Sequence, residues 1–178
     1  SEGRELGGKT LGILGFGSIG QTVAAKARAF GLAVAAHDPL LPADAPAWTT
    51  HGVRRCGLDE LLGVADILTL HLPLVEATRG LVGRERLARM KRGAVLVNTA
   101  RGGIVDDAAL AALVRSGHLG GAAVDVFERE PLPAGSPLAG IRNVLLTPHV
   151  AGVTQESNVR VSGMVAERVA ASLERLGL

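Results

Sequence analysis

Apolar and polar residues alternate along the chain in short blocks, and the spacing within each block predicts a strand or a helix. Residues 10–14 are almost all apolar and predict a buried strand. Apolar residues then recur at helical spacing from about Ser18 until Gly31, which is a typical helix stop. A second apolar run covers residues 32–36. A strand, a glycine-rich turn, a helix and a strand in this order indicate a βαβ unit.

The same alternation continues through the rest of the chain. We expect further strands near Val53 and at 67–70, 94–97, 122–126 and 144–146, and helices at 58–62, 85–90 and 107–115. Three prolines between residues 39 and 46 predict a loop around Trp48. From Thr154 onward the pattern predicts one long amphipathic helix, whose apolar face carries Val161, Val165, Val169, Leu173 and Leu176.

Strands that are continuous apolar runs, alternating with helices, are typical of a parallel sheet covered by helices on both faces. The predicted fold class is therefore α/β, with a Rossmann-type doubly wound parallel sheet in a three-layer α/β/α arrangement. The expected strand order is 3-2-1-4-5-6. One domain of this kind accounts for residues 1–178, because 47% of the chain is hydrophobic and supplies a sizeable core.

Composition and charge narrow the range of partners and locations. The formal net charge is only +2 and no cluster of Lys and Arg occurs, so no nucleic-acid partner is expected. No apolar run approaches the roughly 20 residues that span a bilayer, so no membrane association is expected. The one cysteine, Cys56, has no partner for an internal disulfide, which fits a reducing compartment and predicts a cytoplasmic location.

The glycine-rich turn after the first strand has the spacing of a dinucleotide-binding site. Gly15 permits a tight turn, Gly17 lets the backbone approach a pyrophosphate, and Gly20 allows close packing of helix and strand. The helix that begins near Ser18 and Ile19 directs free N–H groups and the positive end of its dipole toward the phosphates.

An acidic residue, Asp38, follows the second predicted strand. A carboxylate at this place accepts hydrogen bonds from the ribose hydroxyls of NAD and repels the 2′-phosphate of NADP. No Arg follows directly to receive that phosphate, so the predicted cofactor is NAD. A glycine-rich turn and a surface acid also occur in other α/β proteins, but strand, spacing and acid together favour the nucleotide site.

Composition also limits the chemistry that such a site performs. A dehydrogenase needs an acid/base and a cation that polarises the carbonyl. The absence of Tyr excludes a tyrosine proton relay, and a single cysteine excludes a zinc site with two cysteine ligands. Cys56 has no obvious role as a nucleophile. Histidine remains as the acid/base, and the candidates are His37, His51, His71, His118 and His149.

Five stretches of the chain resemble, in order, the motifs of the D-isomer-specific 2-hydroxyacid dehydrogenases, a family that includes phosphoglycerate dehydrogenases. They are LGILGFGSIG, LHLPLVEATRGL, VNTARGGIVDDAAL, AAVDVFEREPL and TPHVAG, and together they cover nearly the whole chain. The resemblance implies an NAD-dependent oxidoreductase that interconverts a D-2-hydroxy acid and its 2-keto acid.

The resemblance also implies three catalytic residues. Arg101 corresponds to the arginine that binds the substrate carboxylate and polarises the carbonyl, His149 to the proton donor and acceptor, and Glu130 to the acid that pairs with it. Arg101 has the planar fork that suits a carboxylate, and a carboxylate beside an imidazole favours the protonated ring. Each residue alone has a simpler interpretation, as a surface arginine, a solvated turn residue and a capped histidine. Their joint position after predicted strands favours catalysis.

By the same resemblance, further residues line the cofactor. Asp125 corresponds to the residue that holds the nicotinamide carboxamide, and Thr99 and Ala100 to backbone contacts beneath the nicotinamide ribose. Leu72 and Pro73 correspond to a wall near the adenosine. Arg101, His149 and Gly152 are also expected to line the cofactor. The other four histidines have no matching catalytic role, and no metal site is expected.

Two departures from the family pattern accompany the match. Val75 and Glu76 occupy the place where many members carry Thr-Pro, so a hydroxyl contact is absent there. Full-length relatives build a second, substrate-selecting domain from segments on both sides of this one, and we expect that domain to be absent from this chain.

A homodimer is expected, since relatives pair through this domain. The alternative function is a non-enzymatic NAD(H)-sensing module like the corepressors that share these motifs, and a domain kept for dimerisation alone is a third possibility. The particular 2-hydroxy acid is not specified by the motifs.

Overall fold

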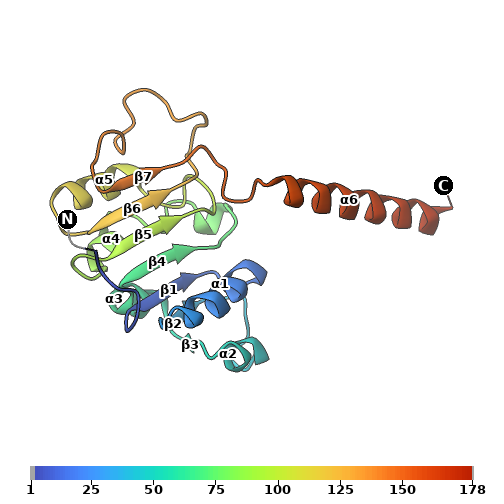
Figure 1. Ribbon diagram of the computed structural model, residues 1–178, viewed down its shortest axis with the longest axis horizontal. Coiled ribbons are helices and arrows are strands. Elements are labelled where there is room, and N and C mark those ends of the chain that lie inside the picture. The colour runs from blue at the N-terminus through green and yellow to red at the C-terminus, as the bar shows by residue number, and fades with distance from the viewer. Residues whose placement is uncertain (1–2, 178) are drawn as a thin grey trace. The chain divides into compact units, whose positions relative to one another are not determined.

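The computed structural model describes residues 3–177, and within them seven parallel strands form one sheet in the order β3-β2-β1-β4-β5-β6-β7 (Figure 1). The strands are β1 (Thr10–Leu14), β2 (Ala33–His37), β3 (Arg54–Arg55), β4 (Ile67–Leu70), β5 (Val95–Asn98), β6 (Gly121–Val124) and β7 (Val144–Leu146). The order reverses between β1 and β4, which is the switch point of a doubly wound sheet. The predicted Rossmann-type sheet is confirmed, and β7 extends the predicted order by one strand.

Helices lie between the strands, and one more helix follows β7. They are α1 (Ser18–Ala29), α2 (Pro46–Thr50), α3 (Leu58–Val64), the 3-10 turn η1 (Glu76–Thr78), α4 (Arg84–Arg89), α5 (Asp107–Arg115) and α6 (Gln155–Leu176). The chain divides into two compact units, one that ends at Pro148 and one that begins at His149. The first unit contains the sheet and the helices up to α5, and the second contains α6.

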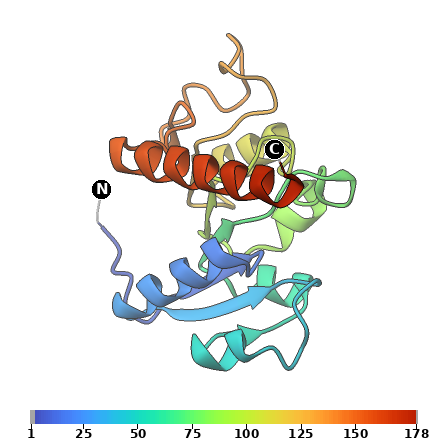
Figure 2. The ribbon, with the colours of Figure 1, turned by 90° about the vertical axis from the view of Figure 1, so that its right-hand side faces the viewer.

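Two apolar cores hold the first unit together, one on each face of the sheet. The larger core packs α3, α4 and α5 against β1, β4, β5 and β6, with Leu61, Leu68 and Leu110 fully buried. The smaller core packs α1 and α2 against β1 and β2, and Figures 1 and 2 show α1 alongside β2. Helices therefore cover β1 on both faces, which explains its continuous apolar sequence.

The structure corrects the prediction of a loop around Trp48. Residues 46–50 form the short helix α2, which Pro46 begins, because proline at the first helical position is already constrained to a helical φ. Trp48 is buried, its indole Nε1 donates to the carbonyl of Pro42 (2.8 Å), and its ring stacks on Phe16 at 4.8 Å. The strand expected near Val53 lies one residue later, as β3.

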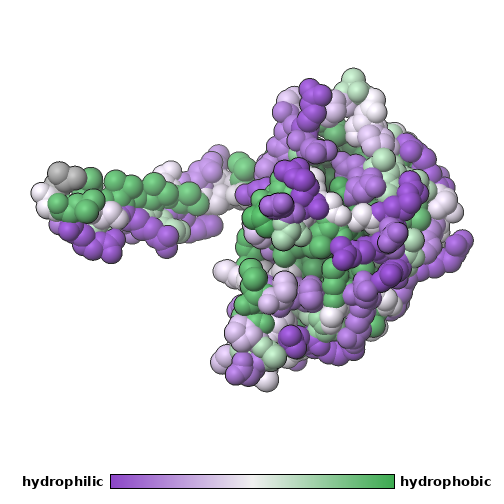
Figure 3. All heavy atoms as spheres, turned by 180° about the vertical axis from the view of Figure 1, so that it is seen from behind, coloured by the Kyte–Doolittle hydropathy of each residue, from purple (hydrophilic) through white to green (hydrophobic). Residues whose placement is uncertain are grey.

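The second unit confirms the long amphipathic helix predicted from Thr154 onward. Thr154 Oγ1 accepts the backbone N–H of Ser157 (2.9 Å), and the helix ends at Gly177, whose φ is 72°. Figure 3 shows apolar side chains gathered along one side of α6 and polar ones along the other. The apolar residues of this face are exposed: Val161, Val165, Val169, Leu173 and Leu176. No helix within residues 3–177 is long and apolar enough to cross a membrane.

Gly12 tests the packing of the central strand against α3. A Cβ at this position would lie 2.7 Å from Cβ of Ala65, so Gly12→Ala should lower the free energy of unfolding by about 1–3 kcal/mol. Gly63 is the matched control, because it lies in α3 with nothing within 4 Å of an added Cβ. Gly63→Ala should raise stability by about 0.5–1 kcal/mol. Denaturant unfolding measures both, and a Gly12→Ala variant as stable as the wild type contradicts this packing.

Candidate cofactor and catalytic site

The carboxyl ends of the strands meet at one edge of the sheet, where ladder hydrogen bonds fix their relative positions. The N–H of Gly15 donates to the carbonyl of His37 (2.9 Å), and that of His71 donates to Leu14 (2.8 Å). Further along the edge, the N–H of Asp125 donates to the carbonyl of Asn98 (2.9 Å). Ligands of open α/β sheets bind outside this edge, next to the switch point.

Two of the three glycines in the predicted phosphate-binding turn are required by the fold itself. Gly15 has a φ of 93°, and a Cβ there would lie 2.5 Å from the carbonyl oxygen of His71. A Cβ on Gly20 would overlap the carbonyl oxygen of Gly15. Gly17 is different, because nothing lies within 4 Å of an added Cβ. The space in front of Gly17 is therefore open, which fits the close approach of a pyrophosphate to its backbone.

The first turn of α1 is suited to an anion. Gly17 is its N-cap and has no side chain to cap the helix, and the first turn contains no acidic residue. Ser18 and Ile19 are exposed there. The first N–H groups of a helix lack acceptors within the helix and carry the positive end of its dipole. A phosphate group therefore fits at this helix end.

Asp38 lies directly after β2, and both of its carboxylate oxygens accept a backbone N–H. Oδ2 accepts from Phe16 in the glycine turn (2.8 Å), and Oδ1 accepts from Leu40 (2.9 Å). On the other side of the turn, Leu72 packs beside Gly15, and Pro73 is exposed. The residues predicted to hold the adenosine half of the cofactor therefore surround one turn.

A second turn, after β5, presents Arg101. The side chain of the buried Asn98 closes this turn, since its Oδ1 accepts the N–H of Ala100 (3.1 Å) and its Nδ2 donates to the carbonyl of Arg101 (3.1 Å). Thr99 and Arg101 are exposed, and the guanidinium of Arg101 donates to the carbonyl of Ala100 (2.6 Å). The turn therefore holds a guanidinium at the edge of the sheet, where it is accessible to a carboxylate.

The turn at Arg101 packs directly against the loop that carries Glu130. A Cβ on Gly102 would overlap the backbone of Phe127 and Glu128. The exposed Glu130 folds back onto this loop, and its Oε1 accepts the N–H of Phe127 (3.0 Å). Gly102 therefore brings together the two loops that carry the predicted arginine and acid.

Asp125 is buried directly after β6, at the start of the loop that carries Glu130. The hydroxyl of Thr147, at the end of β7, donates to Asp125 Oδ1 (2.5 Å). Asp125 also makes contacts with other groups of the chain. A carboxylate held in this way accepts hydrogen bonds from a carboxamide in a fixed direction.

His149 is the first residue of the second unit, so it is described apart from Arg101 and Glu130. Within residues 3–177 it is the one non-glycine residue with a positive φ, 56°. This conformation is uncommon for residues other than glycine and is often retained at functional positions. Gly152, in the same unit, is exposed, and its carbonyl accepts the hydroxyl of Ser157 (2.9 Å).

The remaining histidines make contacts within the fold. Burial lowers the pKa of His71, and Thr69 Oγ1 lies 3.1 Å from its Nε2. His118 Nε2 lies 3.1 Å from the carbonyl of Met90, and the ring of His51 packs edge-on to Phe16.

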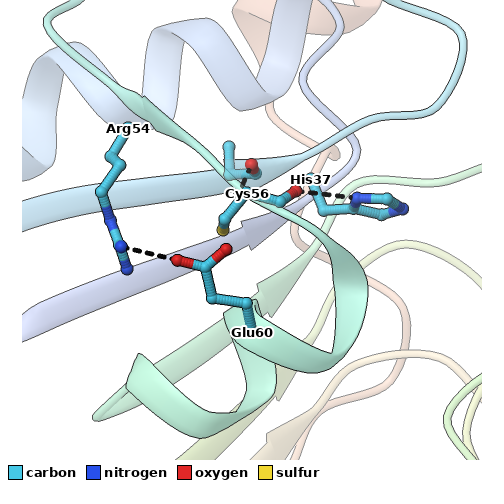
Figure 4. Close-up of polar contacts among 5 residues, drawn as sticks. His37, Arg54, Cys56 and Glu60 are labelled. Carbon is cyan, nitrogen blue, oxygen red and sulfur yellow. Dashed lines mark hydrogen bonds and ion pairs between the residues drawn. The ribbon is translucent and has the colours of Figure 1, made fainter.

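Cys56 is buried next to the end of β2, as Figure 4 shows. Its Sγ donates to the carbonyl of Ala36 (3.6 Å). Burial raises the pKa of its thiol, and the negative charge of Glu60 adds to that effect while Arg54 opposes it. A buried thiol with a raised pKa is a poor nucleophile. Within residues 3–177, no group of three or more His, Cys, Asp or Glu side chains is placed to hold a metal ion.

A cavity of about 500 Å³ is lined in part by the loops that carry Arg101 and Glu130. Its lining includes Gly103, Phe127, Arg79, Glu128 and Asp107. Burial raises the pKa of Asp107 to about 6, with smaller contributions from the charges of Glu128 and Asp106. Arg101, Glu130 and His149 are not among the residues that line this cavity.

Three features define a dinucleotide-binding domain: the glycine turn, the N-terminus of α1 without a side-chain cap, and Asp38 after β2. Residues 1–151 match the family described as D-isomer specific 2-hydroxyacid dehydrogenase, NAD binding domain. The chain belongs to this family, as its NAD-binding domain.

Relatives and solved structures agree with that assignment. The chain is 52% identical, over 172 residues, to the (S)-sulfolactate dehydrogenase of Chromohalobacter salexigens, covering 96% of this chain and 55% of the relative. It is 45% identical, over 167 residues, to the D-3-phosphoglycerate dehydrogenase of Bacillus subtilis, covering 94% of this chain and 31% of the relative. The crystal structure of a glyoxylate reductase from Paecilomyes thermophila superimposes with a TM-score of 0.89 at 36% identity, covering 98% of this chain and 52% of that one. The chain thus spans about half the length, or less, of these proteins.

The sequence analysis did not single out Asn98, Gly102 or Thr147, which hold Arg101, the Glu130 loop and Asp125 in place. One signal was present for Asn98, because asparagine is disfavoured in strands and often bonds its side chain to nearby backbone. The contact of Gly102 with residues 127 and 128 is between segments far apart in the sequence, and no local pattern indicates it.

Gly102 tests the connection between the two loops. Gly102→Ala forces the Arg101 turn away from the backbone of Phe127, so we expect a loss of about 2 kcal/mol or more in the free energy of unfolding. Backbone amide chemical shifts should change in both loops. Gly57→Ala is the control, since Gly57 also precedes a helix but has nothing within 4 Å of an added Cβ. A Gly102→Ala variant with shifts confined to residues 100–104 contradicts the connection.

Proposed function

We propose that the chain is the cofactor-binding and catalytic part of an NAD-dependent oxidoreductase that interconverts a D-2-hydroxy acid and its 2-keto acid. The observation that carries the proposal is the arrangement at the carboxyl edge of the sheet. On one side lie the open glycine turn and the N-terminus of α1. On the other side lies the exposed Arg101, in a turn that packs against the loop with Glu130. The membership of the family supports the same reaction class.

The chemistry divides between the cofactor and the chain. NADH, when bound, supplies the hydride that reduces the keto carbon. The guanidinium of Arg101 binds the substrate carboxylate through its planar fork and polarises the neighbouring carbonyl. His149 donates a proton to the carbonyl oxygen during reduction and accepts it during oxidation. Glu130 is the acid proposed to pair with that ring.

The proposed cofactor contacts are distributed along the carboxyl edge of the sheet. The N–H groups of Gly17, Ser18 and Ile19 bind the pyrophosphate. Asp38 accepts hydrogen bonds from the adenosine ribose, with Leu72 and Pro73 beside the adenosine. Thr99 and Ala100 lie beneath the nicotinamide ribose, and Asp125 accepts the carboxamide N–H. His149 and Gly152 complete the proposed lining on the nicotinamide side.

We also propose that a further domain, outside these 178 residues, selects the substrate. The chain spans 55% of one relative and 31% of another, so those proteins contain further segments. The exposed apolar face of α6 supports the proposal, as does β7, where Leu145 is 63% exposed. Exposed apolar surface of this extent is typical of a face that another part of a protein covers.

A homodimer and a cytoplasmic location complete the proposal. The same exposed apolar surfaces, together with the small net charge, are compatible with pairing of two chains. The free, buried Cys56 is compatible with a reducing compartment. The alternative of a non-enzymatic sensing module has no support, since the relatives and the structure named above are dehydrogenases and a reductase.

The chain should bind NADH in preference to NADPH, because Asp38 repels a 2′-phosphate and no arginine directly follows it. Repulsion between the Asp38 carboxylate and the 2′-phosphate at hydrogen-bonding distance should weaken the binding of NADPH by about tenfold or more. Titration of both cofactors, followed by fluorescence, measures the two dissociation constants. Equal or tighter binding of NADPH would falsify this preference.

The catalytic roles should separate in a full-length enzyme that contains this domain. His149→Ala should lower kcat by roughly 10²–10⁴-fold, the usual contribution of general acid catalysis, with little change in the Kd for NADH. Arg101→Ala should raise the KM for the keto acid and lower kcat together, because Arg101 binds the substrate carboxylate in the ground state and stabilises the polarised carbonyl more strongly in the transition state. His118→Ala is the control and should be active. Steady-state assays of NADH oxidation decide, and a fully active His149→Ala enzyme refutes the mechanism.

A further inference from the structure

The carboxylate of Asp38 is engaged within the fold before any cofactor binds. Its Oδ2 accepts the N–H of Phe16, a residue of the glycine turn whose side chain is fully buried, and its Oδ1 accepts the N–H of Leu40. The distances, 2.8 and 2.9 Å, are those of strong hydrogen bonds to a charged acceptor. The carboxylate therefore connects the turn after β1 to the loop after β2.

Asp38 follows β2, and hydrogen bonds to neighbouring segments fix the end of that strand. The carbonyl of His37 accepts the N–H of Gly15 (2.9 Å). The ring of His37 is tied to β3 through Nδ1, which lies 3.0 Å from the carbonyl of Cys56 (Figure 4). The N–H of Cys56 in turn donates to Ala36 (3.0 Å). His37 and Asp38 thus accept the N–H groups of Gly15 and Phe16, which are consecutive residues of the turn.

We infer that Asp38 is a positioning residue of the phosphate-binding turn as well as the acceptor of the ribose hydroxyls. The second role rests on the proposed function, and the first does not. The roles are compatible, because a carboxylate oxygen accepts two hydrogen bonds and the fold uses one at each oxygen. One side chain then sets both the preference among cofactors and the geometry of the turn that binds their phosphates.

This coupling changes the expected result of a cofactor-switching substitution. If Asp38 acted on the ribose alone, its removal would weaken NADH and strengthen NADPH. With the positioning role, Asp38→Ala leaves the N–H of Phe16 without its acceptor and loosens the turn, so the affinities for both cofactors fall. A switch of cofactor at this position therefore requires a replacement acceptor for the N–H of Phe16.

The first experiment uses the 178-residue chain without cofactor. Amide hydrogen exchange of Phe16 should be at least tenfold faster in Asp38→Ala and in Asp38→Leu, whose side chain is close to that of Asp in size, because neither variant keeps an acceptor oxygen. The melting temperature should fall by roughly 5 °C in Asp38→Ala. Asp44→Asn is the control, since it removes the same charge from an exposed position in the loop that follows. Exchange at Phe16 equal to that of the control in both variants overturns the inference, and Asp38→Leu decides alone if Asp38→Ala does not fold.

The second experiment separates the two roles with an NADH analogue whose adenosine ribose lacks both hydroxyls. A residue that acts on the ribose alone loses its effect with this ligand. We expect Asp38→Ala to bind the analogue at least fivefold more weakly than the wild type does, because the phosphate-binding turn is displaced. Equal affinities overturn the inference. If the wild-type chain binds neither NADH nor the analogue, the proposed function fails, and the exchange at Phe16 still decides the role of Asp38 in the turn.

Discussion

The contact between Gly15 and the carbonyl of His71 sets the geometry on which the rest of the site depends. The chain leaves β1 so close to the end of β4 that no side chain fits between them, and a φ of 93° turns it at once toward α1. The turn directs the first N–H groups of α1 over the edge of the sheet, and Asp38 holds the turn in that position. A helix dipole and a set of free donors thus face one place, which is the physical basis of phosphate binding by this fold.

The other half of the edge is built on a different principle. Here side-chain hydrogen bonds and one close backbone contact define two loops. Asn98 closes the turn that presents Arg101, Gly102 sets that turn against Phe127, and Thr147 orients Asp125. Because these supports are buried or packed, the exposed Arg101 and Glu130 start from fixed backbone positions. Preorganised groups of this kind lose little entropy when a substrate arrives, which favours catalysis.

The parts of the structure that local pattern determines were predictable from the sequence. The helix over Asp107–Arg115 and the strand over Ile67–Leu70 have the predicted bounds, because apolar period and strand length specify them locally. The helix α2 was missed, since its formation depends on the burial of Trp48 against Phe16, a contact between distant segments. The candidate site divides in the same way. The glycines and Asp38 have a spacing that is visible in sequence, whereas the supports at Gly102 and Thr147 arise only when β5, β6 and β7 are side by side.

We propose that NADH binds along the carboxyl edge of the sheet, across the switch point between β1 and β4. Adding NADH to the isotopically labelled chain and mapping the amide chemical shifts that change tests this placement. We expect changes at residues 15–20, at Asp38, at residues 99–101 and at Asp125, with none at Gly93 and Gly120 on the opposite edge, where the two residues pack together. Changes centred on that opposite edge, or none anywhere at millimolar NADH, would contradict it.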